Sequence, residues 1–307
     1  MRIVSLLPSA TEMVFLLGLG DRLVGRSAEC DFPAEVRRKP VVSRPVVADG
    51  PSAEINKAVS GHLHAGRGLY TVDRALLARL RPDLILTQEV CGVCAPTPGT
   101  VEAALRGLRH RPEVLSLSPS RLGDIPDDVR RVAEAAGCAD LGDRAASALR
   151  KRLARVRELL GRVRERPRVF CLEWLDPPFA AGHWIPDMVE AAGGEDLLGL
   201  AGQDSRPLSW PDIAELRPEF LVAMPCGLSL ERARRELPEA ARKASDFWRA
   251  IPAVRRGRLF ATDGSAYFNR PGPRVCEGVE ILAEILHPER ARGLAPVGSF
   301  EPWRPES

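Results

Sequence analysis

Short apolar runs alternate with helical patterns along most of the chain. The clearest runs are Ile3–Leu7, Glu113–Leu117, Val169–Leu172 and Arg258–Thr262. They lack the regular alternation of apolar and polar residues that marks a half-exposed strand, which favours strands buried on both faces of a parallel sheet. Because such strands take turns with helical segments, the pattern predicts an α/β fold.

The loop after the first strand is the first candidate for a ligand site. The sequence Ser9-Ala10-Thr11-Glu12 resembles a capping box and predicts a helix that begins at once. This interpretation places Pro8 and Ser9 in the loop at the carboxyl end of the first strand. Ligands of open α/β sheets bind at that edge.

The same order of elements occurs twice. Residues 80–91 read Leu-Arg-Pro-Asp, an apolar run and a cysteine, and residues 216–226 read Leu-Arg-Pro-Glu, an apolar run and a cysteine. The first apolar run of each half follows an arginine, Arg2 or Arg168. Each half then closes on a predicted helix, at 122–136 and 274–286. The repeat predicts two similar α/β halves.

The segment between the halves predicts one long helix. From Arg144 to Arg166 it contains no proline and one glycine, and its apolar residues recur at three- and four-residue spacing. We therefore predict an N-terminal lobe at 1–141, a linker helix at 142–166, and a C-terminal lobe at 167–307 with an irregular tail from His287. Two lobes joined by one rigid helix predict a ligand-binding cleft between them.

Charge and targeting signals limit the partners and the locations that the sequence predicts. The 307 residues carry 44 basic and 41 acidic side chains, so no strong attraction to nucleic acid is expected. No apolar run reaches the roughly 18 residues of a membrane span. The first residues show no separate apolar region with a cleavage site, which predicts a cytoplasmic protein as encoded. A periplasmic or cell-surface location is the alternative if a leader is missing.

Most of the seven cysteines lie at or just after predicted strands. Cys91 and Cys94 form a CxxC motif, which is typical of a redox pair or half of a zinc site. With Cys226 they are the candidate metal ligands. The alternative is that the cysteines are small buried hydrophobic residues, as we expect for Cys138 and Cys276 on helices.

One group of polar residues could perform acid–base chemistry. Glu173 and Asp176 lie near the end of a predicted strand, close in sequence to His183. No nucleophile elbow, phosphate-binding loop, HExxH motif or GxGxxG motif is present. We therefore predict no catalytic residues and no enzymatic activity. The remaining histidines are expected at the surface or in loops, namely His62, His64, His110 and His287.

Several stretches, in order along nearly the whole chain, carry a resemblance to a known family. They are Arg2–Glu12, Cys30–Pro33, Leu80–Ile85, Pro177–Gly182 and Asp263–Arg274. Together with the linker helix, they resemble the class III periplasmic binding proteins of ABC importers for cobalamin, ferric siderophores and haem. The nearest match is the vitamin B12-binding branch. The resemblance implies two Rossmann-like lobes with parallel sheets, joined by one long helix.

In the cobalamin binders, aromatic side chains clasp the corrin ring, because flat rings bury a large area at little entropy cost. By this resemblance Tyr267 and Phe268 match the family's aromatic pair, and Gln88 stands where the B12 proteins tend to place a tryptophan. Trp174 and Trp184 could supply the missing area. The candidate ligand-binding residues are Ser9, Thr11, Asp31, Gln88, Glu89, Trp174, Asp176, Pro178, His183, Trp184, Tyr267, Phe268 and Arg270.

The resemblance also implies an ABC permease as partner, docked through one surface glutamate per lobe. This chain departs from that pattern, because residues 94–98 contain no acid and the second position falls near Pro211, with Asp212 adjacent. We expect no required cofactor, with bound cobalamin or metal as an alternative.

Two other functions stay open. In a siderophore or haem binder, Arg206, Arg270 and Arg274 would neutralise an anionic chelate. A metal- or thiol-dependent cytosolic enzyme would use the cysteines.

Overall fold

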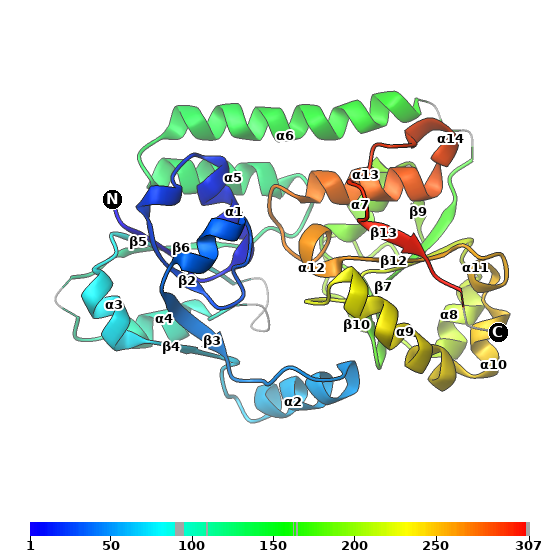
Figure 1. Cartoon of the computed structure of the whole chain (residues 1–307), viewed down its shortest axis with the longest axis horizontal. Helices are drawn as coiled ribbons and strands as arrows, with labels where there is room; N and C mark the ends of the chain where they lie inside the picture. Colours follow the sequence, from blue (N-terminus) through cyan, green and yellow to red (C-terminus); the bar gives the residue numbers. More distant parts are fainter. Residues whose placement is uncertain (90–94, 109, 162, 164, 305–307) are drawn as a thin grey trace. The chain divides into compact units, whose positions relative to one another are not determined.

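The computed structural model describes residues 1–89, 95–108, 110–161, 163 and 165–304, which form two compact units (Figure 1). The first unit comprises Met1–Gly50, Glu54–Pro119 and Gly123–Leu149, and the second comprises Pro51–Ala53, Ser120–Leu122 and Arg150–Ser307. No helix among the described residues is long and apolar enough to cross a bilayer.

The predicted linker helix is present with different ends. Helix α6 runs from Ala139 to Leu160, whereas the sequence placed the helix at 142–166. Gly161 follows it with a φ of +61°, a backbone conformation that glycine adopts without strain and that commonly ends helices. The division between the two units falls within α6, after Leu149.

The first sheet has the strand order β4-β3-β2-β1-β5-β6 and is parallel except for β4, which pairs antiparallel with β3. Its strands are β1 (Ile3–Ser5), β2 (Leu23–Ser27), β3 (Val41–Pro45), β4 (Tyr70–Val72), β5 (Leu84–Gln88) and β6 (Glu113–Leu117). The helices of this half are α1 (Pro8–Leu16), α2 (Ser52–His64), α3 (Arg74–Leu80), α4 (Pro98–Leu105) and α5 (Asp124–Ala135), with short 3-10 helices at Gly20–Arg22 and Ala34–Arg38.

Strands β1 and β5 are buried on both faces, as their apolar runs predict. Val4 and Ile85 pack with residues of α3 and α4 in one core cluster. Successive side chains of a strand point to opposite faces, so the fully buried Ile3 and Leu84 occupy the other face. Figure 1 shows α1 and α5 on one side of the sheet and α3 and α4 on the other.

The second sheet has the strand order β10-β8-β7-β11-β12-β13, and β9 pairs with β7. Its strands are β7 (Arg168–Leu175), β8 (Pro178–Ala180), β9 (Glu195–Asp196), β10 (Arg206–Pro207), β11 (Phe220–Ala223), β12 (Leu259–Thr262) and β13 (Phe300–Pro302). Its helices are α7 (Ile185–Ala191), α8 (Trp210–Leu216), α9 (Leu230–Ala244), α10 (Asp246–Ala250), α11 (Pro252–Arg255), α12 (Gly264–Tyr267), α13 (Val275–Leu286) and α14 (Pro288–Ala291).

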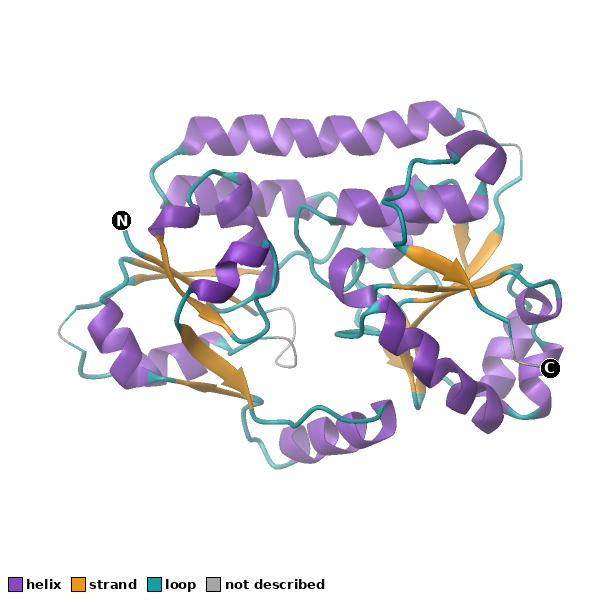
Figure 2. Ribbon diagram, in the orientation of Figure 1, coloured by secondary structure: helices purple, strands orange, loops and turns teal. Residues whose placement is uncertain are grey.

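The parallel strands expected from the sequence form the centre of this sheet, and antiparallel strands flank them. Strands β7, β11 and β12 are parallel, whereas β8, β10 and β13 are antiparallel to their neighbours (Figure 2). Only Asp176 and Pro177 separate β7 from β8, and a connection that short can join antiparallel strands but not parallel ones. The parallel core is therefore β7-β11-β12, the counterpart of β1-β5-β6.

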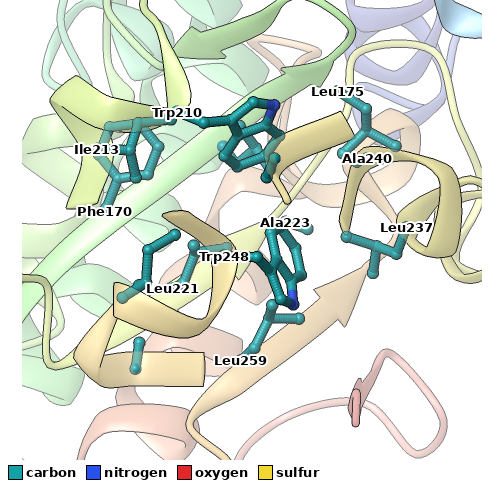
Figure 3. Packing of buried hydrophobic residues seen from close by; sticks show 14 of the residues in the cluster. Phe170, Leu175, Trp210, Ile213, Leu221, Ala223, Leu237, Ala240, Trp248 and Leu259 are labelled. Carbon is teal, nitrogen blue, oxygen red and sulfur yellow. The ribbon is translucent and has the colours of Figure 1, made fainter. Parts of the chain in front are cut away.

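The core of the second unit packs around tryptophans (Figure 3). The ring of Trp248 meets that of Trp210 edge-on, with centroids 5.3 Å apart, and that of Trp303 with centroids 5.7 Å apart. Trp303 and Phe300 lie in the tail, for which the sequence predicted an irregular structure. The tail forms α14 and pairs β13 with β12, because its few aromatic residues find core partners.

The repeated Leu-Arg-Pro-acid motif has the same structure in both units. Arg81 and Arg217 follow α3 and α8 in the left-handed conformation, with φ values of 43° and 51°. The Nε of Arg2 donates to the carbonyl of Leu80 at 2.6 Å, and its backbone N–H donates to Asp83 at 2.6 Å.

In the second unit, Arg168 makes the same contacts, with the carbonyl of Leu216 and the carboxylate of Glu219, both at 3.0 Å. Each arginine thus ties the start of the central strand to the end of a helix, and the repeat predicted from sequence is confirmed in the contacts.

Two local predictions were wrong. Ser9 does not cap α1, because the helix begins at Pro8 and the cap residue is Leu7. Proline suits the first helical position, since it has no N–H to satisfy and its φ is already helical. Cys138 lies in the connection between α5 and α6, not on a helix, and is half-buried.

Helix α6 is tied to α13 by charged hydrogen bonds. Arg152 donates to both carboxylate oxygens of Glu280, at 2.7 and 2.6 Å, and to Glu277 at 2.9 Å. Glu280 is only 8% exposed, so the loss of its partner would leave a buried carboxylate unpaired.

We therefore expect Arg152→Met to lower the free energy of unfolding by about 1–3 kcal/mol, because removing one partner of a buried pair exposes the desolvation cost of the other. Urea unfolding would measure the loss. Arg155→Met, at an exposed position of the same helix, is the matched control. Equal stability of the two variants would contradict the role given to Arg152.

Asp128 makes stability depend on pH. Burial raises its pKa from 3.8 to about 6, although Arg131 contacts it at 2.8 Å. Because the pKa of Asp128 is higher in the folded chain than in the unfolded chain, its protonated form contributes to the stability of the fold. This contribution is complete below pH 3.8 and is lost as the pH rises through about 6.

Asp128→Asn cannot ionise, so we expect it to be more stable than the wild type by about 1–3 kcal/mol near pH 8, with no difference near pH 4. Denaturant unfolding at both pH values would measure this, with Asp127→Asn, an exposed neighbour on α5, as control. A gain of equal size at both pH values would argue against ionisation as the cause.

Candidate functional site

The carboxyl edge of the second unit's sheet gathers most of the predicted site residues. Strands β7, β11 and β12 are parallel and end at Leu175, Ala223 and Thr262. The carboxyl ends of parallel strands lie at one edge of a sheet, where α/β proteins bind ligands. The segments after β7 and β12 carry several of the candidate side chains, and others follow β8.

The loop after β12 is built around Asp263 and Gly264. Asp263 caps α12 by accepting the N–H of Ala266 at 2.6 Å. A Cβ on Gly264 would lie 2.3 Å from the carbonyl of Pro225, so only glycine permits this close approach. The loop presents Tyr267 half-buried, with the Arg274 guanidinium 5.8 Å from its ring centroid. Burial raises the pKa of Tyr267.

The loop after β8 carries His183 and Trp184. His183 has a φ of 50°, and its ring stacks on Trp184 with centroids 5.5 Å apart. Burial lowers the pKa of His183, while Asp204, 3.8 Å away, opposes this shift. Trp184 is buried and its Nε1 donates to the carbonyl of Phe268 at 2.7 Å. This hydrogen bond ties the loop after β8 to the loop after β12.

Glu173 lies on β7 at the same edge. Its Oε1 accepts from Nδ2 of Asn269 at 3.2 Å, and Ser205 also hydrogen-bonds its carboxyl group. Burial raises the pKa of Glu173, and these two hydrogen bonds lower it in part. Neither Asn269 nor Ser205 was among the residues predicted from the sequence. Asn269 stands within the family-like stretch 263–274, whereas no local pattern distinguishes Ser205.

The predicted acid–base group is not assembled. Asp176 forms an ion pair with Lys243 of α9, whereas His183 faces Asp204. The Nε1 of Trp174 donates to the backbone carbonyl of Asp176 at 3.2 Å, which holds its half-buried indole beside the β7–β8 turn. Pairing with Lys243 could not be foreseen, since the two residues lie far apart in sequence.

The first unit places its candidates around the ends of β1 and β5. Thr11 on α1 is fully buried and donates to the sulfur of Cys30 at 3.0 Å. Asp31 follows Cys30 and is half-buried, Gln88 is buried at the end of β5, and Glu89 is exposed. Ser9 is also buried.

Exposure divides the predicted residues into two groups. Side chains with accessible surface are Asp31, Glu89, Trp174, Asp176, His183, Tyr267 and Arg270, and those buried in the structure are Ser9, Thr11, Gln88, Pro178, Trp184 and Phe268. The buried group supports the loops, and Phe268 is fully buried. A role for each in binding stays a prediction.

Two of the described cysteines, Cys171 and Cys276, have the character of neutral thiols. Burial raises the pKa of Cys171 far above its ordinary value and that of Cys276 to about 12. Within the described ranges, no group of three His, Cys, Asp or Glu residues is placed to hold a metal. Cys91 and Cys94 lie outside the described residues, so their proposed metal site with Cys226 stays a prediction.

The opposite edge of the second sheet has a hollow of about 420 Å³, lined in part by Arg166, Glu219 and Arg290. Arg166 and Arg290 already donate to the carbonyls of Glu190 and Leu160. Both arginines are therefore already hydrogen-bonded to the backbone. Because ligands of α/β proteins generally bind at the carboxyl edge, we place the candidate site at that edge.

Asp212, beside the predicted docking position, has a local structural role. Its carboxylate accepts from the N–H and the hydroxyl of Ser209, at 2.9 and 2.6 Å, in a capping box at the start of α8. These hydrogen bonds lower the pKa of Asp212.

Comparison with known proteins agrees with this geometry. The vitamin B12-binding protein of Vibrio cholerae is 24% identical over 292 residues, covering 93% of this chain and 88% of that protein. An uncharacterized ABC transporter substrate-binding lipoprotein of Bacillus subtilis is 24% identical over 293 residues, covering 94% and 80%. The structure of a periplasmic heme-binding protein from Pseudomonas aeruginosa matches with a TM-score of 0.72 at 20% identity, covering 94% and 93%.

These likenesses confirm the fold class and the resemblance found in the sequence. The family of periplasmic binding proteins matches residues 3–266, which include the parallel cores of both sheets and the start of the loop that carries Tyr267. The chain belongs to the periplasmic binding protein family.

Proposed function

We propose that this protein binds a corrinoid and acts as the substrate-binding component of an ABC importer. The observation that carries the proposal is the set of half-buried aromatic side chains in the second unit, Trp174 near the end of β7, His183 after β8 and Tyr267 after β12. Family membership and the nearly full-length similarity to a vitamin B12-binding protein support it. Placement of the ligand between the two lobes stays a prediction.

The chemistry of the edge suits a large ring with polar substituents. Flat aromatic faces bury the apolar surface of a macrocycle, and a few fixed polar groups orient it. A corrinoid has such a ring and carries carboxamide side chains, which both donate and accept hydrogen bonds. Asn269 and Ser205 are polar groups held in place at this edge by their hydrogen bonds to Glu173, the neighbour of Trp174 on β7.

Haem is the second candidate, and one observation favours it. The phenol of Tyr267 and the imidazole of His183 are groups that ligate haem iron, and Arg274 lies over the Tyr267 ring. Arg206 and Arg270 would meet haem carboxylates, as they would an anionic siderophore chelate. Burial, however, raises the pKa of Tyr267, which disfavours the phenolate that binds ferric iron.

An ABC permease is the partner that this proposal requires. The named relative from Bacillus subtilis is a substrate-binding lipoprotein of such a transporter. Because the carboxylate of Asp212 is held in a capping box, we propose that docking on the second unit does not depend on this residue alone. The compartment in which the chain works stays a prediction.

We expect cyanocobalamin to quench tryptophan fluorescence at micromolar concentration. Tyr267→Ala should weaken binding about tenfold or more, because an aromatic contact of this size contributes about 1–3 kcal/mol. The chain has two tyrosines, so Tyr70→Ala on β4 is the matched control and should bind as the wild type does.

A parallel titration with haemin separates the two candidates. Saturable binding of haemin, with no response to cyanocobalamin at about 100 μM, a weak affinity on the usual scale, would replace the corrinoid by haem. Binding of neither ligand by a folded protein would remove both.

A further inference from the structure

Two buried oxygen atoms at the candidate site have no hydrogen-bond partner among the described residues. They are Oε2 of Glu173 and Oδ1 of Asn269. Their companion atoms, Oε1 of Glu173 and Nδ2 of Asn269, are hydrogen-bonded to each other at 3.2 Å. Buried polar atoms are rarely left unpaired, because each costs about 1–3 kcal/mol. The two unpaired atoms belong to the same pair of side chains.

Backbone irregularity directs Glu173 toward Asn269. Leu172 pairs with Ala180 and Trp174 with Phe179, so one step along β8 matches two steps along β7. Glu173 is the extra residue of this β-bulge, a feature that often redirects a side chain beside a functional site. Asn269 is fixed from its own side, because its N–H donates to the carbonyl of Gly264 at 2.9 Å.

The surroundings of Glu173 favour its neutral form. Burial raises its pKa, and the groups that oppose this shift are the hydroxyl of Ser205 and the amide of Asn269, neither of which is charged. The nearby cation Lys243 pairs with Asp176, on the turn after β7. A negative charge on Glu173 would help to raise the pKa of Cys171, a buried thiol two residues earlier on β7.

We propose that Glu173 carries a proton in the folded protein and forms a cyclic acid–amide pair with Asn269. In this pair Nδ2 of Asn269 donates to Oε1 of Glu173, and Oε2 of Glu173 donates to Oδ1 of Asn269. One proton thus satisfies both of the unpaired oxygens. A carboxyl group and an amide that share one such bond and lie in one plane have their second atoms opposite each other, and this is the arrangement that the proposal requires.

The pair makes Glu173 a positioning residue. It ties β7 to the loop after β12, which carries Tyr267 on one side of Asn269 and Arg270 on the other. It also keeps a bare carboxylate away from the aromatic side chains of the edge. This consequence for the ligand rests on the proposed function, whereas the pairing itself does not.

Exchanging acid and amide tests the pair. The glutamine side chain of the Glu173→Gln variant can make both bonds without a proton, so this variant should be as stable as the wild type below pH 4.5 and at least as stable at neutral pH. Asn269→Asp places two carboxyl groups together and should lower the folding equilibrium constant about tenfold or more. The double variant Glu173→Gln/Asn269→Asp again has one acid and one amide, and it should recover most of that loss.

The proton itself is visible by infrared spectroscopy. The wild type at neutral pH should show a carbonyl band of a protonated carboxylic acid that is absent from Glu173→Gln. Since the folded-state pKa of Glu173 is raised, its contribution to stability is lost as the pH rises through that value. The wild type should therefore lose stability relative to Glu173→Gln as the pH rises above 4.5, the ordinary pKa of this side chain.

Absence of that band, or a double variant no more stable than Asn269→Asp, would overturn the proposal. Titration with cyanocobalamin is a separate measurement, in which Asn269→Ala should bind several-fold more weakly than the wild type. If no variant and no wild-type protein binds the corrinoid, the proposed function fails, while the infrared and stability results still decide the pair.

Discussion

The parallel pairing of three strands is the constraint on which each unit depends. In the first unit β1 pairs with β5 and β5 with β6, and in the second β7 pairs with β11 and β11 with β12. Parallel strands need a crossover between them, so each returning strand follows a helix. The Leu-Arg-Pro-acid motif ends that helix and starts the returning strand. An arginine at the start of the first strand, Arg2 or Arg168, hydrogen-bonds to the end of the helix and to the acid of the motif.

This constraint also creates the candidate site. Parallel strands end at one edge, and the chain must leave that edge in loops whose polar groups need partners. In the second unit the partners come from other loops, as in the bond from Trp184 to the carbonyl of Phe268. The loops are therefore held by hydrogen bonds among themselves, and Trp174, His183 and Tyr267 stay half-buried on a fixed support.

Membership of the periplasmic binding protein family agrees with a site of this kind, in which binding needs rigid supports and no reactive group. Burial raises the pKa of the thiols of Cys171 and Cys276. Asp176, one of the carboxylates considered for acid–base chemistry, forms an ion pair with Lys243. Glu173, a half-buried acid at the same edge, has an amide as its neighbour.

The sequence by itself determined the α/β class, the two halves, the long helix and most strand positions, because local apolar patterns and the proline after each helix act over short distances. The tertiary structure decided the antiparallel strands β8, β10 and β13, since pairing at a sheet edge depends on which segments arrive there. It also decided which candidate residues are buried and which meet. Thr11 with Cys30, Asp176 with Lys243, and Glu173 with Asn269 are contacts between residues far apart in the chain, and no local pattern encodes them.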